Sequence, residues 1–116
     1  MNFILVIDDE ESIRELLENF LTKLGYRVHV AKDGREGIRL LNRDCKYGAV
    51  ITDIGMPEIN GNDIVRHIRN SETSHTPVLA ITGLGALDSQ TNLFDMVIQK
   101  PFNLKKIQIA LQSLTR

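Results

Sequence analysis

Short apolar segments alternate with helical patterns along the chain, and this alternation restricts the fold more than any other feature. Four segments are short and almost continuously apolar: residues 3–7, 49–52, 78–82 and 96–98. Such runs are typical of strands in a parallel sheet, because both faces of that sheet are covered. Residues 27–31 (RVHVA) alternate instead, with Val28 and Val30 on one side and His29 on the other, which indicates an edge strand. We therefore predict five strands.

The segments between these strands carry apolar residues three and four positions apart, which is the spacing of an amphipathic helix. The first helix is predicted to end at Gly25. Its apolar stripe consists of Ile13, Leu16, Leu17, Phe20, Leu21 and Leu24. Further helices are predicted over about residues 34–42, after Gly61, and after Asn103, which is a suitable N-cap. Residues 83–95 are rich in glycine and polar side chains, so only a short or irregular fourth helix is expected.

Strands and helices in this order predict an α/β fold with a doubly wound parallel sheet and right-handed crossovers. The chain has 116 residues, which is the size of one domain spanning residues 1–116. With a net charge of −1, the chain is not expected to bind nucleic acid. No apolar run approaches the roughly 20 residues that cross a bilayer, so no membrane association is expected. Cys45 is the only cysteine, which fits a reducing cytoplasm.

Polar side chains follow the apolar runs at the point where each predicted strand ends. Asp8 and Asp9 come directly after the first strand, Asp53 follows the third, Thr82 ends the fourth, and the fifth leads to Lys100. In open α/β sheets, ligands bind outside the carboxyl ends of the strands. We therefore expect these five side chains to meet at one edge of the sheet.

This set of residues is suited to phosphoryl transfer. Mg²⁺ binds to one or two carboxylates together with backbone, water and phosphate oxygens, and it would offset the repulsion between neighbouring acids. An aspartate can act as a nucleophile and form an aspartyl phosphate. Lys100 would neutralise phosphate charge, and the hydroxyl of Thr82 could donate a hydrogen bond to a phosphate oxygen.

Four stretches of the sequence together resemble the receiver domain of two-component response regulators. They are "VIDDEES", "TDIGMPEINGNDIVRHIR", "TPVLAITG" and "QKPFNLKKI", in that order along the chain. The pattern Asp-x-x-Met-Pro-x-x-x-Gly, at residues 53–61, is the most specific of these features. The similarity covers essentially the whole chain.

The resemblance implies a flavodoxin-like (βα)5 fold with strand order 2-1-3-4-5. It also implies a signalling domain rather than a turnover enzyme, which accepts a phosphoryl group from a histidine kinase or a phosphotransfer protein. The changed surface near the fourth and fifth strands would then bind a separate effector protein or a second copy of the chain.

The resemblance assigns a role to each polar residue at the sheet edge. Asp53 would be the phosphoacceptor, and Asp8, Asp9, Asp53 and the backbone carbonyl of Gly55 would hold Mg²⁺. Lys100 would pair with Asp53 at rest and with the phosphoryl group after activation, and the peptide bond between this lysine and the next residue, a proline, would be cis.

The switch residues match the family less completely. Thr82 would be the hydroxyl that moves toward the phosphoryl group, but Val97 stands where receivers usually carry Tyr or Phe. A valine cannot change rotamer as a ring does, and the segment between Thr82 and Lys100 is about one helical turn shorter than usual. A second hypothesis therefore stays open, that of a phosphorylation-independent protein-interaction module with a receiver fold.

Overall fold

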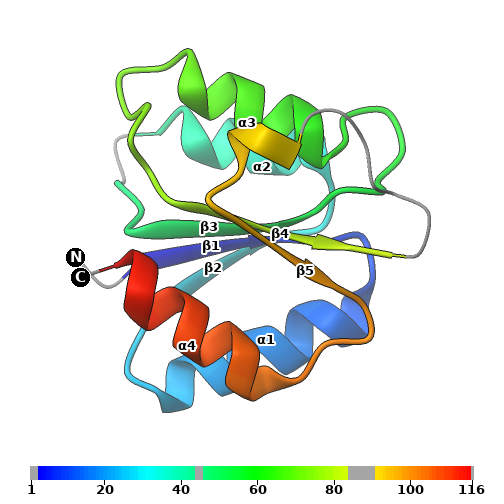
Figure 1. The fold of residues 1–116 in the computed structure, drawn as a ribbon. Helices are drawn as coiled ribbons and strands as arrows, with labels where there is room; N and C mark the ends of the chain where they lie inside the picture. Colours follow the sequence, from blue (N-terminus) through cyan, green and yellow to red (C-terminus); the bar gives the residue numbers. More distant parts are fainter. Residues whose placement is uncertain (1–2, 44–45, 84–90, 116) are drawn as a thin grey trace.

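The structure is a computed structural model that describes residues 3–43, 46–83 and 91–115 (Figure 1). Five parallel strands form one sheet in the order β2-β1-β3-β4-β5. The strands are β1 (Phe3–Ile7), β2 (Arg27–Ala31), β3 (Ala49–Asp53), β4 (Val78–Thr82) and β5 (Met96–Gln99). The predicted fold class and strand order are confirmed, and β3 and β5 each extend one residue further than the apolar pattern indicated.

Helices cover both faces of the sheet, as the continuous apolar strands required. Among the described residues there are four α-helices: α1 (Glu11–Lys23), α2 (Gly34–Leu41), α3 (Gly61–Arg69) and α4 (Leu104–Leu114). Helices α1 and α4 lie on one face, and α2 and α3 on the other (Figure 1). The connection between β4 and β5 contains a 3-10 turn, Thr91–Leu93. The rest of the predicted fourth helix, residues 84–90, lies outside the described residues.

The hydrophobic core has two layers, because successive residues of a strand point to opposite faces of the sheet. Ile4 and Val6 of β1 pack with α1 and α4, whereas Leu5 and Ile7 pack with α2 and α3. All four side chains are fully buried. Burial of each such side chain stabilises the fold by about 1.5–3 kcal/mol.

The apolar stripe predicted for the first helix is wider than the face that this helix buries. Leu17 and Leu21 are fully buried in the core between α1 and the sheet. Leu16 and Leu24 belong to the predicted stripe but are 43% and 37% exposed. A helix on an open sheet contacts it along a narrow line, which leaves the edges of a broad stripe in solvent.

Local side-chain signals mark the starts of two helices, of which the cap at Asn103 was predicted from the sequence. Asn103 caps α4, since its side chain accepts a hydrogen bond from the backbone of Lys106 at 2.8 Å. Asn60 caps α3 through a reciprocal capping box with Asp63. Gly61 then lies against β3, and a Cβ atom at this position would be 2.6 Å from the backbone oxygen of Asp53. The glycine in the 53–61 motif therefore allows α3 to begin directly beside the end of β3.

Within the described ranges, none of the helices combines the length and the hydrophobicity needed to cross a membrane.

Candidate functional site

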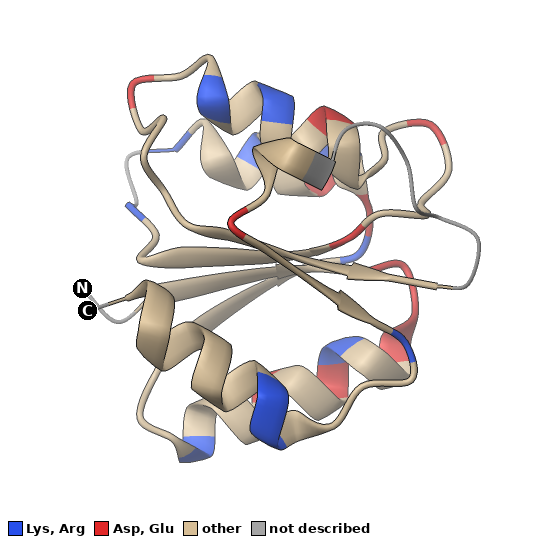
Figure 2. Cartoon of the chain, in the orientation of Figure 1, with Lys and Arg blue, Asp and Glu red and all other residues tan. Residues whose placement is uncertain are grey.

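The predicted polar residues all lie at the carboxyl edge of the sheet, and four of them, Asp8, Asp9, Asp53 and Lys100, form one group. The register of the strands aligns their ends, because Ile7 pairs with Thr52, Asp53 with Ile81 and Thr82 with Gln99. The acids that follow β1 and the lysine that follows β5 therefore lie close to each other at one edge (Figure 2).

Three carboxylates form the centre of the site. Asp8 and Asp53 are almost fully buried, at 2% and 5% exposure, whereas Asp9 is exposed. Carboxylate oxygens of these three residues all lie within 4.8 Å of one another. Such a group of hard oxygen ligands, open on one side to solvent through Asp9, fits a divalent cation such as Mg²⁺.

Burial makes the ionised form of two of these acids unfavourable. The pKa of Asp8 is raised from 3.8 to about 6, mainly by burial and further by the charge of Asp53, although a backbone hydrogen bond from Glu10 and the charge of Lys100 lower it. The pKa of Asp53 is raised as well, chiefly by burial, against the opposing charge of Lys100 and a backbone hydrogen bond from Gly55. A bound cation would offset this cost.

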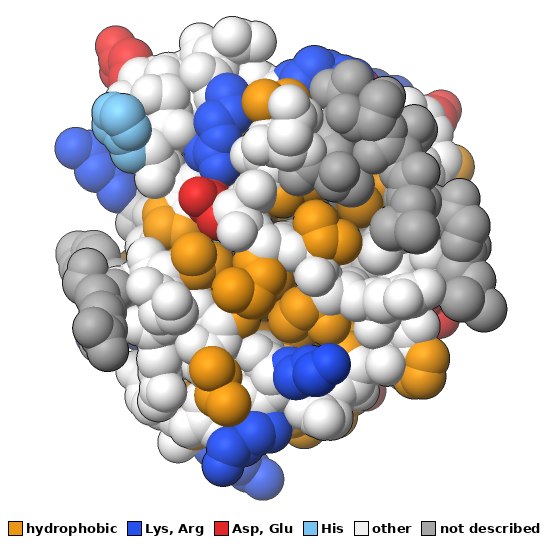
Figure 3. All heavy atoms as spheres, in the orientation of Figure 1, with side chains coloured by type: hydrophobic (Ala, Val, Ile, Leu, Met, Phe, Trp, Pro, Cys, Tyr) orange, Lys and Arg blue, Asp and Glu red, His pale blue; other side chains and the backbone are white. Residues whose placement is uncertain are grey.

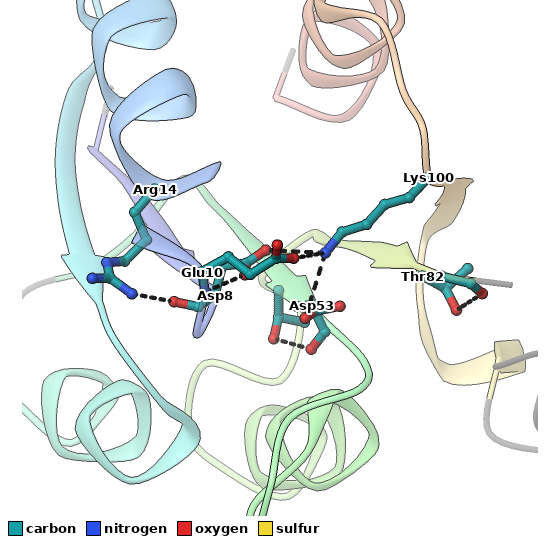
Figure 4. Close-up of polar contacts among 8 residues, drawn as sticks. Asp8, Glu10, Arg14, Asp53, Thr82 and Lys100 are labelled. Carbon is teal, nitrogen blue, oxygen red and sulfur yellow. Dashed lines mark hydrogen bonds and ion pairs between the residues drawn. The ribbon is translucent and has the colours of Figure 1, made fainter. Parts of the chain in front are cut away.

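Lys100 reaches three carboxylates from the end of β5 (Figure 4). Its Nζ atom lies 3.6 Å from Asp53 Oδ2, 3.6 Å from Asp8 Oδ2 and 3.1 Å from Glu10 Oε1. Burial by itself would lower the pKa of Lys100, but the hydrogen bond with Glu10 and the charges of the carboxylates outweigh it, so the pKa is raised. The lysine is therefore positively charged at neutral pH.

The backbone around the lysine is fixed at the same edge. The backbone N–H of Lys100 donates to the carbonyl of Thr82 at 2.7 Å, which ties the end of β5 to the end of β4. The Lys100–Pro101 peptide bond is cis, as the resemblance implied.

Thr82 is buried at the end of β4, and its hydroxyl donates to the carbonyl of Gly83 at 3.2 Å. In Figure 4 this side chain lies apart from the group formed by Lys100 and the carboxylates.

Gly55 is exposed two residues after Asp53, at the same edge. Val97 is half-buried and packs against the core on the side of α2 and α3. The roles assigned to Thr82 and Gly55 stay predictions.

Glu10 also belongs to this site, through its contact with Lys100, which the sequence did not reveal. Its place at the start of a helix is explained equally well by the helix dipole, which favours an acid there. The contact with Lys100 joins residues 90 positions apart and has no signature in the local pattern.

The sequence profile of the family described as "Response regulator receiver domain" matches residues 4–112. The chain belongs to this family. The receiver is 40% identical over 108 residues to "Uncharacterized transcriptional regulatory protein YrkP" of Bacillus subtilis (strain 168), an alignment that covers 90% of this chain and 45% of that protein. The chain spans about half the length of the curated relatives it matches.

Solved structures of receivers share the fold throughout. A response regulator receiver domain protein from Clostridium thermocellum superposes with a TM-score of 0.91 at 32% identity, covering 99% of this chain and 94% of that one. The response regulator TrrA from Thermotoga maritima, in complex with Mg²⁺-BeF, superposes with a TM-score of 0.88 at 31% identity, covering 98% and 99%. Receivers with this fold act in two-component signalling, and the homologous proteins are response regulators and transcriptional regulators.

Proposed function

We propose that residues 1–116 form a single receiver domain in which Asp53 accepts a phosphoryl group and thereby switches the binding of a partner. The observation that carries this proposal is the convergence of three carboxylates within 4.8 Å of one another, with the ammonium of Lys100 3.6 Å from Asp53. Such a site provides a nucleophile, ligands for a cation and a counter-charge for the phosphoryl group.

The chemistry follows from the positions of these residues. A carboxylate oxygen of Asp53 attacks the phosphorus of a phosphohistidine, the new O–P bond forms as the P–N bond breaks, and the electron pair leaves with the imidazole. Asp8, Asp9, Asp53 and the Gly55 carbonyl would hold Mg²⁺, which neutralises charge on the phosphoryl oxygens when it is bound. Lys100 turns from the resting carboxylates to a phosphoryl oxygen and stabilises the product.

The phosphodonor is proposed to be a histidine kinase or a phosphotransfer protein. The similar receiver TrrA carries Mg²⁺-BeF in its structure, which supports Mg²⁺ as the cation here. We propose a signalling role rather than turnover catalysis, because Asp53 would be modified and not regenerated within a catalytic cycle. The single cysteine, Cys45, fits the reducing cytoplasm as the compartment.

The response to phosphorylation is proposed to appear on the face formed by β5 and α4. Hydrophobic side chains gather there (Figure 3), and Ile109 of α4 is 54% exposed. Val97 and Met96 of β5 are only half-buried. Because Thr82 and Lys100 lie at the ends of β4 and β5, a movement of either residue would change this face, where an effector or a second copy would bind. Loss of that binding in Ile109→Lys, with phosphorylation intact, is expected.

Intact mass measured after incubation with acetyl phosphate tests the phosphorylation. We expect a phosphoryl adduct on the wild-type protein in the presence of Mg²⁺, and none after chelation or in Asp53→Asn. The isosteric Asn keeps the shape of the site and removes the nucleophile. An adduct of equal extent in Asp53→Asn would refute Asp53 as the acceptor, and no adduct on the wild type under any condition would refute the proposed function.

A further inference from the structure

The shortest contact of the lysine ammonium at this site is with a residue outside the set that the family motifs identify. Lys100 Nζ lies 3.1 Å from Glu10 Oε1, whereas its distances to Asp8 and Asp53 are both 3.6 Å. Only the contact with Glu10 satisfies the geometry of a hydrogen bond among these three. The resting lysine is therefore held at least as closely by Glu10 as by Asp53.

Both ends of this contact are anchored through the backbone. The N–H of Glu10 donates to Asp8 Oδ1 at 2.9 Å, and the Glu10 carbonyl accepts from the N–H of Arg14 at 3.1 Å. The N–H of Lys100 donates to the carbonyl of Thr82 at 2.7 Å. The two side chains thus reach toward each other from fixed positions, which lowers the conformational entropy lost in pairing.

A phosphoryl group on Asp53 would change the balance around this ammonium. It carries a charge of about −1.5 to −2 at neutral pH, together with strong acceptor oxygens, in place of one carboxylate charge. Lys100 is largely sheltered, at 20% side-chain exposure, while Glu10 is 57% exposed. Glu10 can therefore return to solvent when the lysine turns toward the phosphoryl group, whereas buried Asp8 cannot.

We propose that Glu10 is a positioning residue for Lys100: it holds the ammonium in the unphosphorylated receiver and competes with the phosphoryl group for it. This inference rests on the proposed function. Exposed or partly exposed ion pairs stabilise by up to about 1 kcal/mol, so competition of this strength weakens phosphoryl binding by roughly two- to fivefold.

The test compares Glu10→Gln with wild type and with Glu11→Gln. Both variants remove one negative charge at the start of α1 and keep the side-chain shape, but of these two glutamates only Glu10 forms an ion pair with Lys100 in the described structure. The probe is beryllofluoride, titrated at saturating Mg²⁺, with the dissociation constant taken from NMR shifts. We expect Glu10→Gln to bind beryllofluoride roughly two- to fivefold more tightly than Glu11→Gln does.

A second readout is the Cε–Hε signal of Lys100, which is measured first without metal or phosphoryl analogue. The Cε–Hε signal of Lys100, assigned by its absence from Lys100→Arg, is expected to shift in metal-free Glu10→Gln and to stay unchanged in Glu11→Gln. In the beryllofluoride complexes, the signals of wild type and Glu10→Gln are expected to coincide, because Glu10 has then released the lysine.

Equal affinities of the two Gln variants, weaker binding by Glu10→Gln, or an unchanged resting Lys100 signal would each overturn the role of Glu10. These outcomes differ from failure of the proposed function, in which the wild-type protein itself takes up neither beryllofluoride nor a phosphoryl group.

Discussion

Replacement of Asp8 by Asn is predicted to stabilise the metal-free receiver. Asp8 is 2% exposed, and its pKa is raised from 3.8 to about 6. This difference corresponds to about 3 kcal/mol of free energy that opposes folding when the carboxylate is ionised. Asn keeps an Oδ1 acceptor for the backbone N–H of Glu10 and carries no charge. We therefore expect Asp8→Asn to raise the free energy of unfolding by about 2–3 kcal/mol at pH 8 without Mg²⁺.

The stability gained by Asp8→Asn depends on pH in a direction fixed by the raised pKa of Asp8. Below pH 3.8, Asp8 is protonated in both the folded and the unfolded protein, so its burial carries no charge penalty. As the pH rises toward about 6, the unfolded chain loses this proton before the folded protein does, and stability falls. The advantage of Asp8→Asn is thus small near pH 4, grows between pH 4 and 6, and is constant above that range.

Urea unfolding followed by circular dichroism, at a series of pH values in the presence of a chelator, measures this difference. Glu11→Gln is the matched control, since Glu11 is exposed at the start of α1 and its neutralisation is expected to change stability by less than about 0.5 kcal/mol. Added Mg²⁺ should stabilise the wild type more than Asp8→Asn. An Asp8→Asn protein that is no more stable than wild type at pH 8 would refute the argument from burial.

Three further predictions concern the cation and two structural residues. Mg²⁺ affinity is expected to fall about tenfold between pH 7.5 and pH 5, because a proton on Asp8, whose pKa is raised to about 6, competes with the metal. An NMR titration at the two pH values measures this change, and a pH-independent affinity would contradict the prediction. Gly61→Ala is expected to cost about 1–3 kcal/mol of unfolding free energy and to slow phosphorylation, since its Cβ would lie 2.6 Å from a backbone oxygen of β3, whereas Gly83→Ala, which meets nothing within 4 Å, should leave stability almost unchanged. Arg69→Ala is expected to lower the free energy of unfolding by about 2–3 kcal/mol, because this side chain donates to two carbonyls of the loop before β4 at 2.8 Å. The exposed Arg66 pairs within its own helix, so Arg66→Ala should lower it by less than about 1 kcal/mol in the same urea experiment.

Much of the fold could be predicted because few structures bury continuous apolar runs. Segments such as 49–52 and 78–82 must have both faces covered, and this requires helices on either side of a parallel sheet. The order of the strands could not be obtained from the alternation, since several orders cover the same runs equally well; it came from the resemblance to receivers. The position of the polar residues followed from the general location of sites at the carboxyl ends of strands.

The contact between Glu10 and Lys100 could not be predicted from the sequence, for a physical reason. It depends on how far two loops 90 positions apart approach each other, and on rotamers that the local pattern does not encode. Leu16 illustrates the converse limit, because helical spacing indicates which residues share a stripe but not how much of that stripe the sheet covers.

The position of the phosphoryl group tests most directly whether Asp53 is the phosphoacceptor. Sodium borohydride reduces an aspartyl phosphate to homoserine, and tandem mass spectrometry of the digested protein then locates the modified residue. After treatment with acetyl phosphate and Mg²⁺, we expect homoserine at position 53 and at no other aspartate. Homoserine at Asp8 or Asp9, or phosphate retained elsewhere while Asp53 stays unmodified, would contradict this expectation.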